Sequence, residues 1–279
     1  MDGAQTNGAL ETSQEEETET VPNANDRERN TSPTEYFPLS SRTVFCIFAS
    51  VNILAAAYAP TQDCDEVFNY WESTHYLSHG FGLQTWEYSP DYAIRSWLYI
   101  LIHAIPGKLV FLLFLPRRTE FFVIRVVLAC ACAGCETRLF STISQSIGPR
   151  VAVNFMIAMA SSSGMFYASV AYLPSSFAMY TTMMGTAAFM DMNGGLKTNL
   201  GIVWFALGAT IGWPFSAALI FPLFLGEFVF AGLVGQVKGV AYRVWEGILV
   251  ILVIVVSVSA SNGFGAWLLL TSLGPTSGC

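Results

Sequence analysis

The sequence predicts an all-α protein, a polytopic bundle of transmembrane helices with an amphipathic loop after the first span. Of its 279 residues, 53% are hydrophobic and only 12% are charged, and the mean hydropathy is +0.49, whereas soluble domains average about 25% charged residues. The apolar residues also form long continuous runs. A spanning β-barrel would alternate apolar and polar positions, so the runs indicate helices.

The acidic balance of the chain is a property of its N-terminal segment. The net charge is −7, and residues 1–42 hold nine acidic and three basic residues, a net charge of −6. This segment is rich in Glu, Thr, Asn and Ser, so we predict a disordered tail that cannot bury enough apolar surface to fold. The remaining residues are nearly neutral and show no basic stripe, which predicts that nucleic acid is not a partner.

The first predicted span covers residues 44–59. Arg27, Arg29 and Arg42 precede it and acidic residues follow it, so the positive-inside tendency predicts a cytosolic N-terminus and a first loop in the ER lumen. Further apolar segments lie near residues 96–115, 121–139, 151–170, 173–192, 199–222 and 244–270. We predict six to seven spans in total, and the charges leave their parity open.

Segment 96–115 has two interpretations. It contains Pro106 and Lys108, and a lysine at the centre of the bilayer costs about 3 kcal/mol. We therefore favour an interfacial or re-entrant helix over a kinked full span, which would reverse the sidedness of every later loop.

Three cysteines lie inside one apolar run, at Cys130, Cys132 and Cys135. The spacing also occurs in metal and redox sites, but cysteine on an apolar helix behaves as a small buried hydrophobe. No histidine lies nearby to complete a zinc site. We predict metal-independent chemistry without a cofactor.

The most polar and aromatic stretch outside the tail is residues 60–95. We predict a helix over residues 64–78 that lies flat at the membrane surface, with aromatic rings at headgroup level and acids toward water. One face of this helix would carry Asp65, Asn69, Glu72 and Tyr76. The opposite face would carry Val67, Tyr70, Trp71, Thr74 and Leu77.

A break at Gly80-Phe81-Gly82 should end this helix. The loop after it carries Trp86, Glu87 and Tyr88, and aromatic faces beside carboxylates are suited to holding a sugar ring. Arg95 follows and could bind a phosphate with two parallel hydrogen bonds. The alternative interpretation is structural, with the acids setting the topology and Arg95 anchoring a helix end.

The stretch DCDEVFNYWE (63–72), followed by THYL, GFGLQTWEYSP and AIRSW, resembles the dolichyl-phosphate-mannose-dependent α-1,2-mannosyltransferases of ER N-glycan precursor assembly. These belong to glycosyltransferase family 22, which has the GT-C membrane fold and also includes the mannosyltransferases of GPI-anchor synthesis. The stretches YLPSSFAMY (172–180) and GWPFSAALIFP (212–222) are similar to the family as well. The likeness covers roughly residues 42–250.

The resemblance implies an ER membrane enzyme whose partners are a dolichol-linked mannose donor and a lipid-linked oligosaccharide acceptor. It implies inverting transfer with one general base, for which we expect Asp65, with Glu66 as the alternative. Adjacent residues on a helix point about 100° apart, so both acids should not reach the same proton. The expected substrate contacts are Glu72, Trp86, Glu87, Tyr88 and Arg95.

Members of the resembled family are longer than this chain. We interpret residues 43–255 as the N-terminal half of a GT-C domain and residues 256–279 as an atypical end, and we expect this chain alone to be inactive or weakly active. Three alternatives remain: a GPI-anchor mannosyltransferase, a non-catalytic truncated paralogue or membrane scaffold, and a carrier. A carrier would need acids in mid-span, whereas the acids here cluster in a loop.

Overall fold

The structure, a computed structural model, describes residues 39–82, 85–88, 95, 97–112, 114, 116, 118–191 and 197–235, with scattered residues between 238 and 256. Within these ranges every secondary-structure element is a helix, which confirms the all-α prediction. The predicted disordered tail and atypical C-terminal end lie almost entirely outside the described residues, as does most of the predicted span at 244–270.

The first helix among the described residues, α2 (Ser41–Tyr58), contains most of the predicted first span. Its N-terminus is capped by the hydroxyl of Ser40, which accepts a hydrogen bond from the backbone N–H of Arg42. Eighteen residues rise about 27 Å, close to the roughly 30 Å hydrocarbon core of a bilayer. In the described part of the chain, α2 alone is both long and apolar enough to span, and the stretches Thr198–Gly212 and Pro214–Glu227 are apolar but shorter.

The first loop contains the π-helical turn η1 (Glu66–Trp71), helix α3 (Glu72–His79) and the short 3-10 helix η2 (Trp86–Tyr88). The helices after it are α4 (Trp97–Leu112), α5 (Arg118–Ser146), α6 (Pro149–Ser161), α7 (Ser163–Ala168), α8 (Pro174–Met190), α9 (Thr198–Leu207) and α10 (Ile220–Val234).

Two of the predicted continuous segments are wrong in detail, because the chain breaks inside them. Segment 151–170 divides at Ser162, whose hydroxyl accepts a hydrogen bond from the Met165 N–H and starts α7. Segment 199–222 continues from α9 into a π-helical turn, η3 (Gly208–Gly212), and stops at Trp213. Pro214, which has no N–H to continue a helix, then opens the 3-10 helix η4 (Pro214–Leu219).

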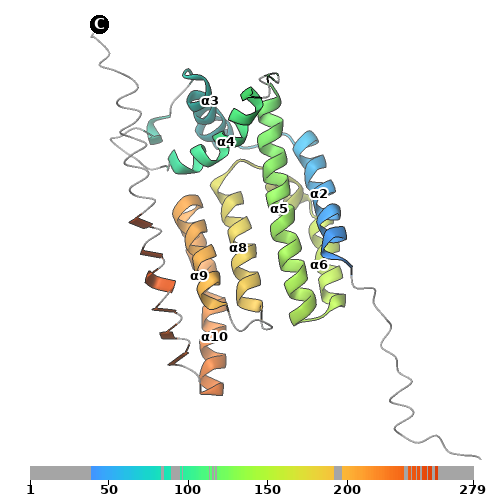
Figure 1. Cartoon of the computed structure of the whole chain (residues 1–279), viewed down its shortest axis with the longest axis vertical. Helices are drawn as coiled ribbons and strands as arrows, with labels where there is room; N and C mark the ends of the chain where they lie inside the picture. The colour runs from blue at the N-terminus through green and yellow to red at the C-terminus, as the bar shows by residue number, and fades with distance from the viewer. Residues whose placement is uncertain are drawn as a thin grey trace, which may run out of the picture. The chain divides into compact units, whose positions relative to one another are not determined.

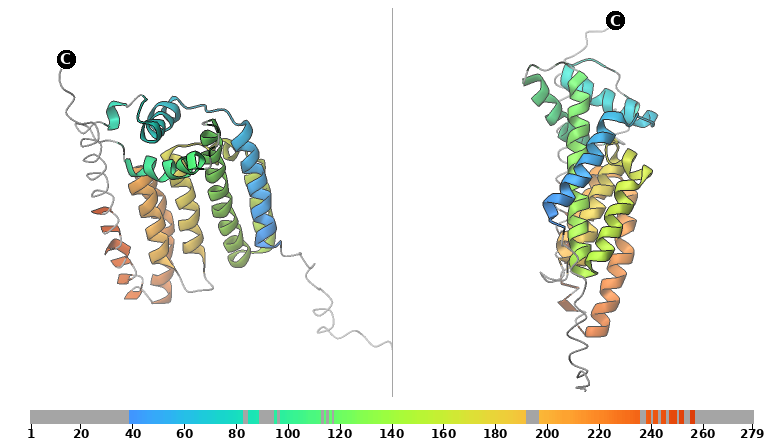
Figure 2. Two further views of the ribbon diagram at one scale, coloured as in Figure 1. Left: turned by 45° about the horizontal axis from the view of Figure 1, so that its top comes forward. Right: turned by 90° about the vertical axis from the view of Figure 1, so that its right-hand side faces the viewer.

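Helices α2, α5, α6, α8 and α9 run side by side, and α3 and α4 lie across one end of them (Figures 1 and 2). The longest described helix, α5, packs against α2, α4, α6 and α8, so it is the neighbour that these four helices share. The interfacial interpretation of segment 96–115 stays a prediction.

Polar groups join α5 to α2 inside the bundle. The Asn52 amide donates to the Glu136 carboxylate at 2.9 Å and lies 3.4 Å from the Ala129 carbonyl oxygen, and all three residues are buried. At the end of α8, Asp191 accepts hydrogen bonds from Arg138 and Lys197, both at 2.9 Å. The bond from Lys197 holds the pKa of Asp191 below its usual range. Pairing of this kind is the default for ionisable groups in an apolar bundle.

Helices α8 and α9 approach each other closely because each presents a glycine to an aromatic ring of the other. A Cβ at Gly185 would lie 2.6 Å from the Phe205 ring, and a Cβ at Gly201 would lie 2.6 Å from the Phe189 ring. Small residues at such positions let helix backbones come together and gain van der Waals contact.

We predict that Gly201→Ala lowers the stability of the purified protein in detergent by about 1–3 kcal/mol, the typical cost of overpacking, measured as a lower thermal unfolding midpoint. Gly134→Ala on α5 is the matched control, because a Cβ there meets no atom within 4 Å. Both substitutions gain about 1 kcal/mol of helix propensity, so the control should keep or raise the midpoint. Equal shifts in the two variants would contradict the packing.

Candidate active site

The helix predicted at residues 64–78 is present, but its first half is the wider π-helical turn η1, followed by α3. The turn brings Glu66 and Trp71, five residues apart, to the same side, and the indole N–H of Trp71 donates to Glu66 Oε1 at 3.1 Å. Helix α3 ends at Gly80, whose φ of 77° is a left-handed conformation that suits glycine. The predicted break at Gly80 is confirmed.

The two predicted faces of this helix are partly wrong, because the π-helical turn changes the register. Asp65 is exposed as expected, but Asn69, placed on the polar face by a regular α-helix, is buried beside Tyr70. Glu66, one residue after Asp65, is also buried. The turn therefore separates the two neighbouring acids into different surroundings.

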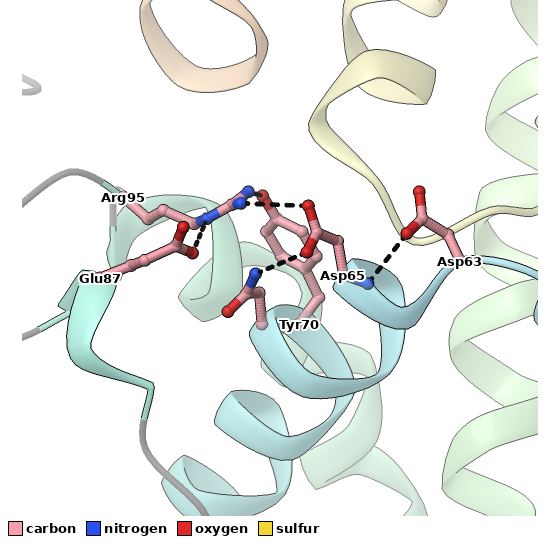
Figure 3. Close-up of polar contacts among 6 residues, drawn as sticks. Asp63, Asp65, Tyr70, Glu87 and Arg95 are labelled. Atoms are coloured by element: carbon pink, nitrogen blue, oxygen red, sulfur yellow. Dashed lines mark hydrogen bonds and ion pairs between the residues drawn. The ribbon is translucent and has the colours of Figure 1, made fainter.

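The Asp65 carboxylate reaches out of the loop toward Arg95 (Figure 3). Its side chain is 56% exposed, and it accepts hydrogen bonds from Asn69 Nδ2 at 3.3 Å and from Arg95 Nη2 at 3.4 Å. Its backbone N–H donates to Asp63 Oδ1 at 2.9 Å. Asp65 thus combines solvent access with a guanidinium neighbour, so a substrate hydroxyl could reach its carboxylate.

Arg95 joins three parts of the loop. Its Nε donates to Glu87 Oε2 at 2.5 Å, its Nη1 donates to the Tyr70 hydroxyl, and its guanidinium carbon lies 5.2 Å from the centre of the Tyr70 ring. Burial raises the pKa of Tyr70 to about 12, although Arg95 opposes the shift. Tyr70 therefore keeps its proton at neutral pH and can accept from Arg95 while offering its own O–H to a further acceptor.

The Glu66 carboxylate points into the protein, with 4% of the residue exposed. Besides the Trp71 indole, its Oε1 accepts a hydrogen bond from the backbone N–H of Tyr172 at 3.0 Å, in the connection between α7 and α8. The Tyr172 hydroxyl in turn lies 2.9 Å from the hydroxyl of Thr74 on α3. Glu66 thus ties the first loop to a segment 106 residues away, an arrangement that suits a positioning role.

The structure brings together three of the residues predicted from sequence, namely Asp65, Glu87 and Arg95. Of the others, Trp86 is 60% exposed, and Tyr88 is buried with its ring centre 4.8 Å from that of Trp97.

Glu72 lines a different cavity of about 330 Å³ between the loop and α5, together with Trp71, His75 and Glu120. The predicted set of contacts is therefore divided over several surfaces of the loop.

Two residues of the site, Tyr70 and Tyr172, were not predicted as functional. The helical pattern assigns Tyr70 to the face opposite the acids, and its spacing from Arg95 carries no signal of contact. Tyr172 lies in a stretch that resembles the family, YLPSSFAMY, but nothing in its residue type indicates that its backbone binds Glu66.

Asp63, Cys64 and Asp65 are exposed side chains whose potential ligand atoms all lie within 4.8 Å of one another. Carboxylates and a thiolate can be offered to a cation in this way. The expectation of metal-independent chemistry stays a prediction.

Comparison with known proteins relates the chain to mannosyltransferases. The model of the Alg9-like mannosyltransferase family matches residues 43–269. The chain is 42% identical to alpha-1,2-mannosyltransferase alg9 of Schizosaccharomyces pombe over 222 residues, 80% of this chain and 38% of that protein. It is 43% identical to human alpha-1,2-mannosyltransferase ALG9 over 183 residues, 65% of this chain and 29% of that protein. The chain thus spans about a third of the length of these relatives, and no solved structure matches it.

We predict that Glu66→Ala speeds hydrogen exchange at the Tyr172 amide, because the substitution leaves a buried N–H without its acceptor, at a cost of about 1–3 kcal/mol. Glu66→Gln keeps a carbonyl oxygen that can accept from both donors and should preserve most of the protection. Asp65→Ala, which removes the exposed neighbour, should leave exchange at Tyr172 unchanged. Exchange mass spectrometry on the detergent-purified protein makes the measurement, and fast exchange in all three variants would contradict the assigned role.

Proposed function

The chain belongs to the Alg9-like mannosyltransferase family, and from this premise we propose that it serves mannose transfer in N-glycan precursor assembly at the ER membrane. In this proposal mannose passes from dolichyl phosphate mannose to a lipid-linked oligosaccharide and forms an α-1,2 linkage with inversion. The relatives named above as alpha-1,2-mannosyltransferases support it. Because the chain spans about a third of their length, the proposal concerns the part that the first loop takes in the reaction.

Asp65 is the proposed general base. An acceptor hydroxyl attacks the anomeric carbon of mannose, the bond from that carbon to the phosphate oxygen breaks, and its electron pair leaves with the phosphate. The hydroxyl proton passes to a carboxylate as the anomeric carbon gains oxocarbenium character. The exposure of Asp65 carries this assignment, because Glu66 faces inward and its Oε1 already accepts two hydrogen bonds.

Arg95 is the proposed contact for the departing phosphate. A phosphate is already a good leaving group, so the step requires no general acid, but its negative charge benefits from a planar guanidinium. Arg95 lies between Asp65 and Glu87, and these two carboxylates hold it in place beside the base. The base and the phosphate contact would then be positioned by one another.

We further propose that the helices form the N-terminal half of a polytopic GT-C bundle in the ER membrane, with the first loop in the lumen. Large apolar side chains are exposed along α2 and α10, among them Leu54 at 55%, Phe221 at 66% and Leu233 at 82%. Exposure of such apolar surfaces to water is unfavourable, whereas in a bilayer lipid tails would cover them. A luminal loop at the end of the bundle could meet a sugar whose lipid stays in the bilayer.

The sidedness of the loop is testable through Cys64, which is free and exposed. In a variant that keeps Cys64 as its sole cysteine, a membrane-impermeant maleimide should label sealed microsomes only after permeabilisation. The matched control moves the sole cysteine to the N-terminal tail, as Ser13→Cys, which should react without permeabilisation. Labelling of Cys64 in intact, sealed vesicles would place the loop in the cytosol and remove the proposed function.

Asp65→Asn should abolish transfer in microsomes supplied with dolichyl phosphate mannose and the lipid-linked acceptor. Loss of a general base lowers the rate by about two to four orders of magnitude, and the amide keeps the size of the side chain. The variant and wild type are compared in the same form of the protein, starting with this 279-residue chain, and the comparison is made in a form in which wild type shows turnover.

Asp191→Asn is the control for this assay, since it makes the same chemical change at the far end of α8 (Figure 1). It should retain activity. Equal turnover by wild type and Asp65→Asn would remove Asp65 as the general base, and the same turnover in microsomes that lack the protein would favour a non-catalytic scaffold. Transfer to a GPI precursor in place of the oligosaccharide would favour the alternative acceptor.

A further inference from the structure

A second cavity lies beside Glu66, on a different surface from the contact between Asp65 and Arg95. Its volume is about 250 Å³, and it is an open pocket lined by residues of the start of the first loop, α5, α7, the connection between α7 and α8, and the N-terminal turn of α8. Glu66 and Arg125 both line it, whereas Asp65 does not. We refer to it as the Glu66–Arg125 pocket.

Arg125 is the unusual member of this pocket. The residue is 4% exposed, its Nη2 donates to the Ala55 carbonyl oxygen at 3.2 Å, and its guanidinium carbon lies 5.2 Å from the centre of the Phe121 ring. Its Nε is buried and has no hydrogen-bond partner in the described part of the chain. A buried guanidinium normally satisfies its five N–H donors, so the Arg125 guanidinium has hydrogen-bonding capacity that the protein does not satisfy.

Glu66 offers a complementary acceptor in the same pocket. Both of its hydrogen bonds fall on Oε1, and among the described contacts Oε2 accepts none. Glu66 and Arg125 do not come within 4.0 Å of each other to form an ion pair in the described structure. An acceptor and a donor therefore face one cavity without satisfying one another.

The charge of the lining selects among possible ligands. Asp63 and Glu66 contribute two negative charges and Arg125 one positive charge, and the N-terminus of α8 adds about half a positive charge. This sum does not favour a free phosphate. Paired donors and acceptors instead suit a neutral polyol, whose hydroxyls both give and accept hydrogen bonds.

The size and remaining wall fit one sugar ring. At about 30 Å³ for each water, the pocket has the volume of about eight waters, enough for a monosaccharide and too little for an oligosaccharide. Ser175, Ser176 and Tyr167 also line the pocket, so the lining includes two residues with hydroxyls and one with an aromatic ring.

We propose that the Glu66–Arg125 pocket is a hexose subsite that takes a single mannose-like ring, with ring hydroxyls donating to Glu66 Oε2 and accepting from Arg125. The identity of the sugar rests on the proposed function. The ring belongs either to the mannose of the polyprenyl-phosphate donor or to a hexose of the acceptor oligosaccharide, and the hydrogen bonding is the same for both. In either case Glu66 has a second role, as a positioning residue that also binds sugar.

The test measures saturation-transfer NMR between the full 279-residue chain in nanodiscs and methyl α-mannoside. Wild type should show transfer, and Ala171→Phe and Ser175→Phe, which fill the pocket from its wall, should weaken binding at least tenfold. Arg125→Lys keeps the charge but loses the planar fork, and it should weaken binding similarly. Arg138→Lys makes the same change on the same helix away from the pocket and should bind as wild type does.

Competition separates the two sources of the ring. Displacement by short-chain polyprenyl phosphate mannose, and not by mannobiose, identifies the donor sugar, and the reverse identifies the acceptor. No transfer from wild type, or undiminished transfer in both filled variants with native thermal midpoints, would overturn the subsite.

This result is distinguishable from the fate of the proposed function. Sugar binding to the chain together with no turnover in the microsomal assay would retain the pocket and remove the transferase. Turnover with an unchanged KM for both sugar substrates in Ala171→Phe would retain the transferase and remove the pocket.

Discussion

The arrangement of the first loop depends on the inward turn of one carboxylate. Glu66 receives a side-chain N–H from Trp71 within the loop and a backbone N–H from Tyr172 across the fold. A buried carboxylate is costly unless hydrogen bonds replace the water it loses, and here two donors converge on one oxygen. Because Tyr172 lies just before α8, this contact sets the distance between the loop and the helix bundle, and with it the position of Asp65.

The separation of Asp65 from Glu66 explains how neighbouring acids can have different chemistry. A π-helical turn is a small local distortion, and such turns are frequent at functional sites. Here it draws Glu66 toward Trp71 and leaves Asp65 outside, where Asn69 and Arg95 orient it. Two exposed acids at the same spot would repel each other and compete for Arg95. Because Glu66 is buried and hydrogen-bonded, Asp65 can pair with Arg95 alone and remain exposed to solvent.

Sequence reasoning was most successful where the signal was local. Apolar runs predicted most of the helices, and Gly80 predicted the end of α3. It failed where the outcome depended on distant contacts. The π-helical turn that buries Asn69 is stabilised by packing that no periodicity reveals, and the partner of Glu66 is a backbone N–H, which every residue except proline possesses.

The same limits explain why the bundle is harder to infer than its helices. The predicted span at 151–170 breaks at Ser162, where a hydroxyl satisfies a helix start, and this break positions the chain to turn back toward Tyr172. A straight span through that region would carry Tyr172 away from Glu66 and would leave Arg125 without the pocket wall that α7 supplies. The hydrogen bond from the Tyr172 N–H to Glu66, which sets the position of the loop and of Asp65, requires the chain between α6 and α8 to fold back at the loop end of the bundle. The interruption of the apolar run at Ser162 therefore helps to position the first loop.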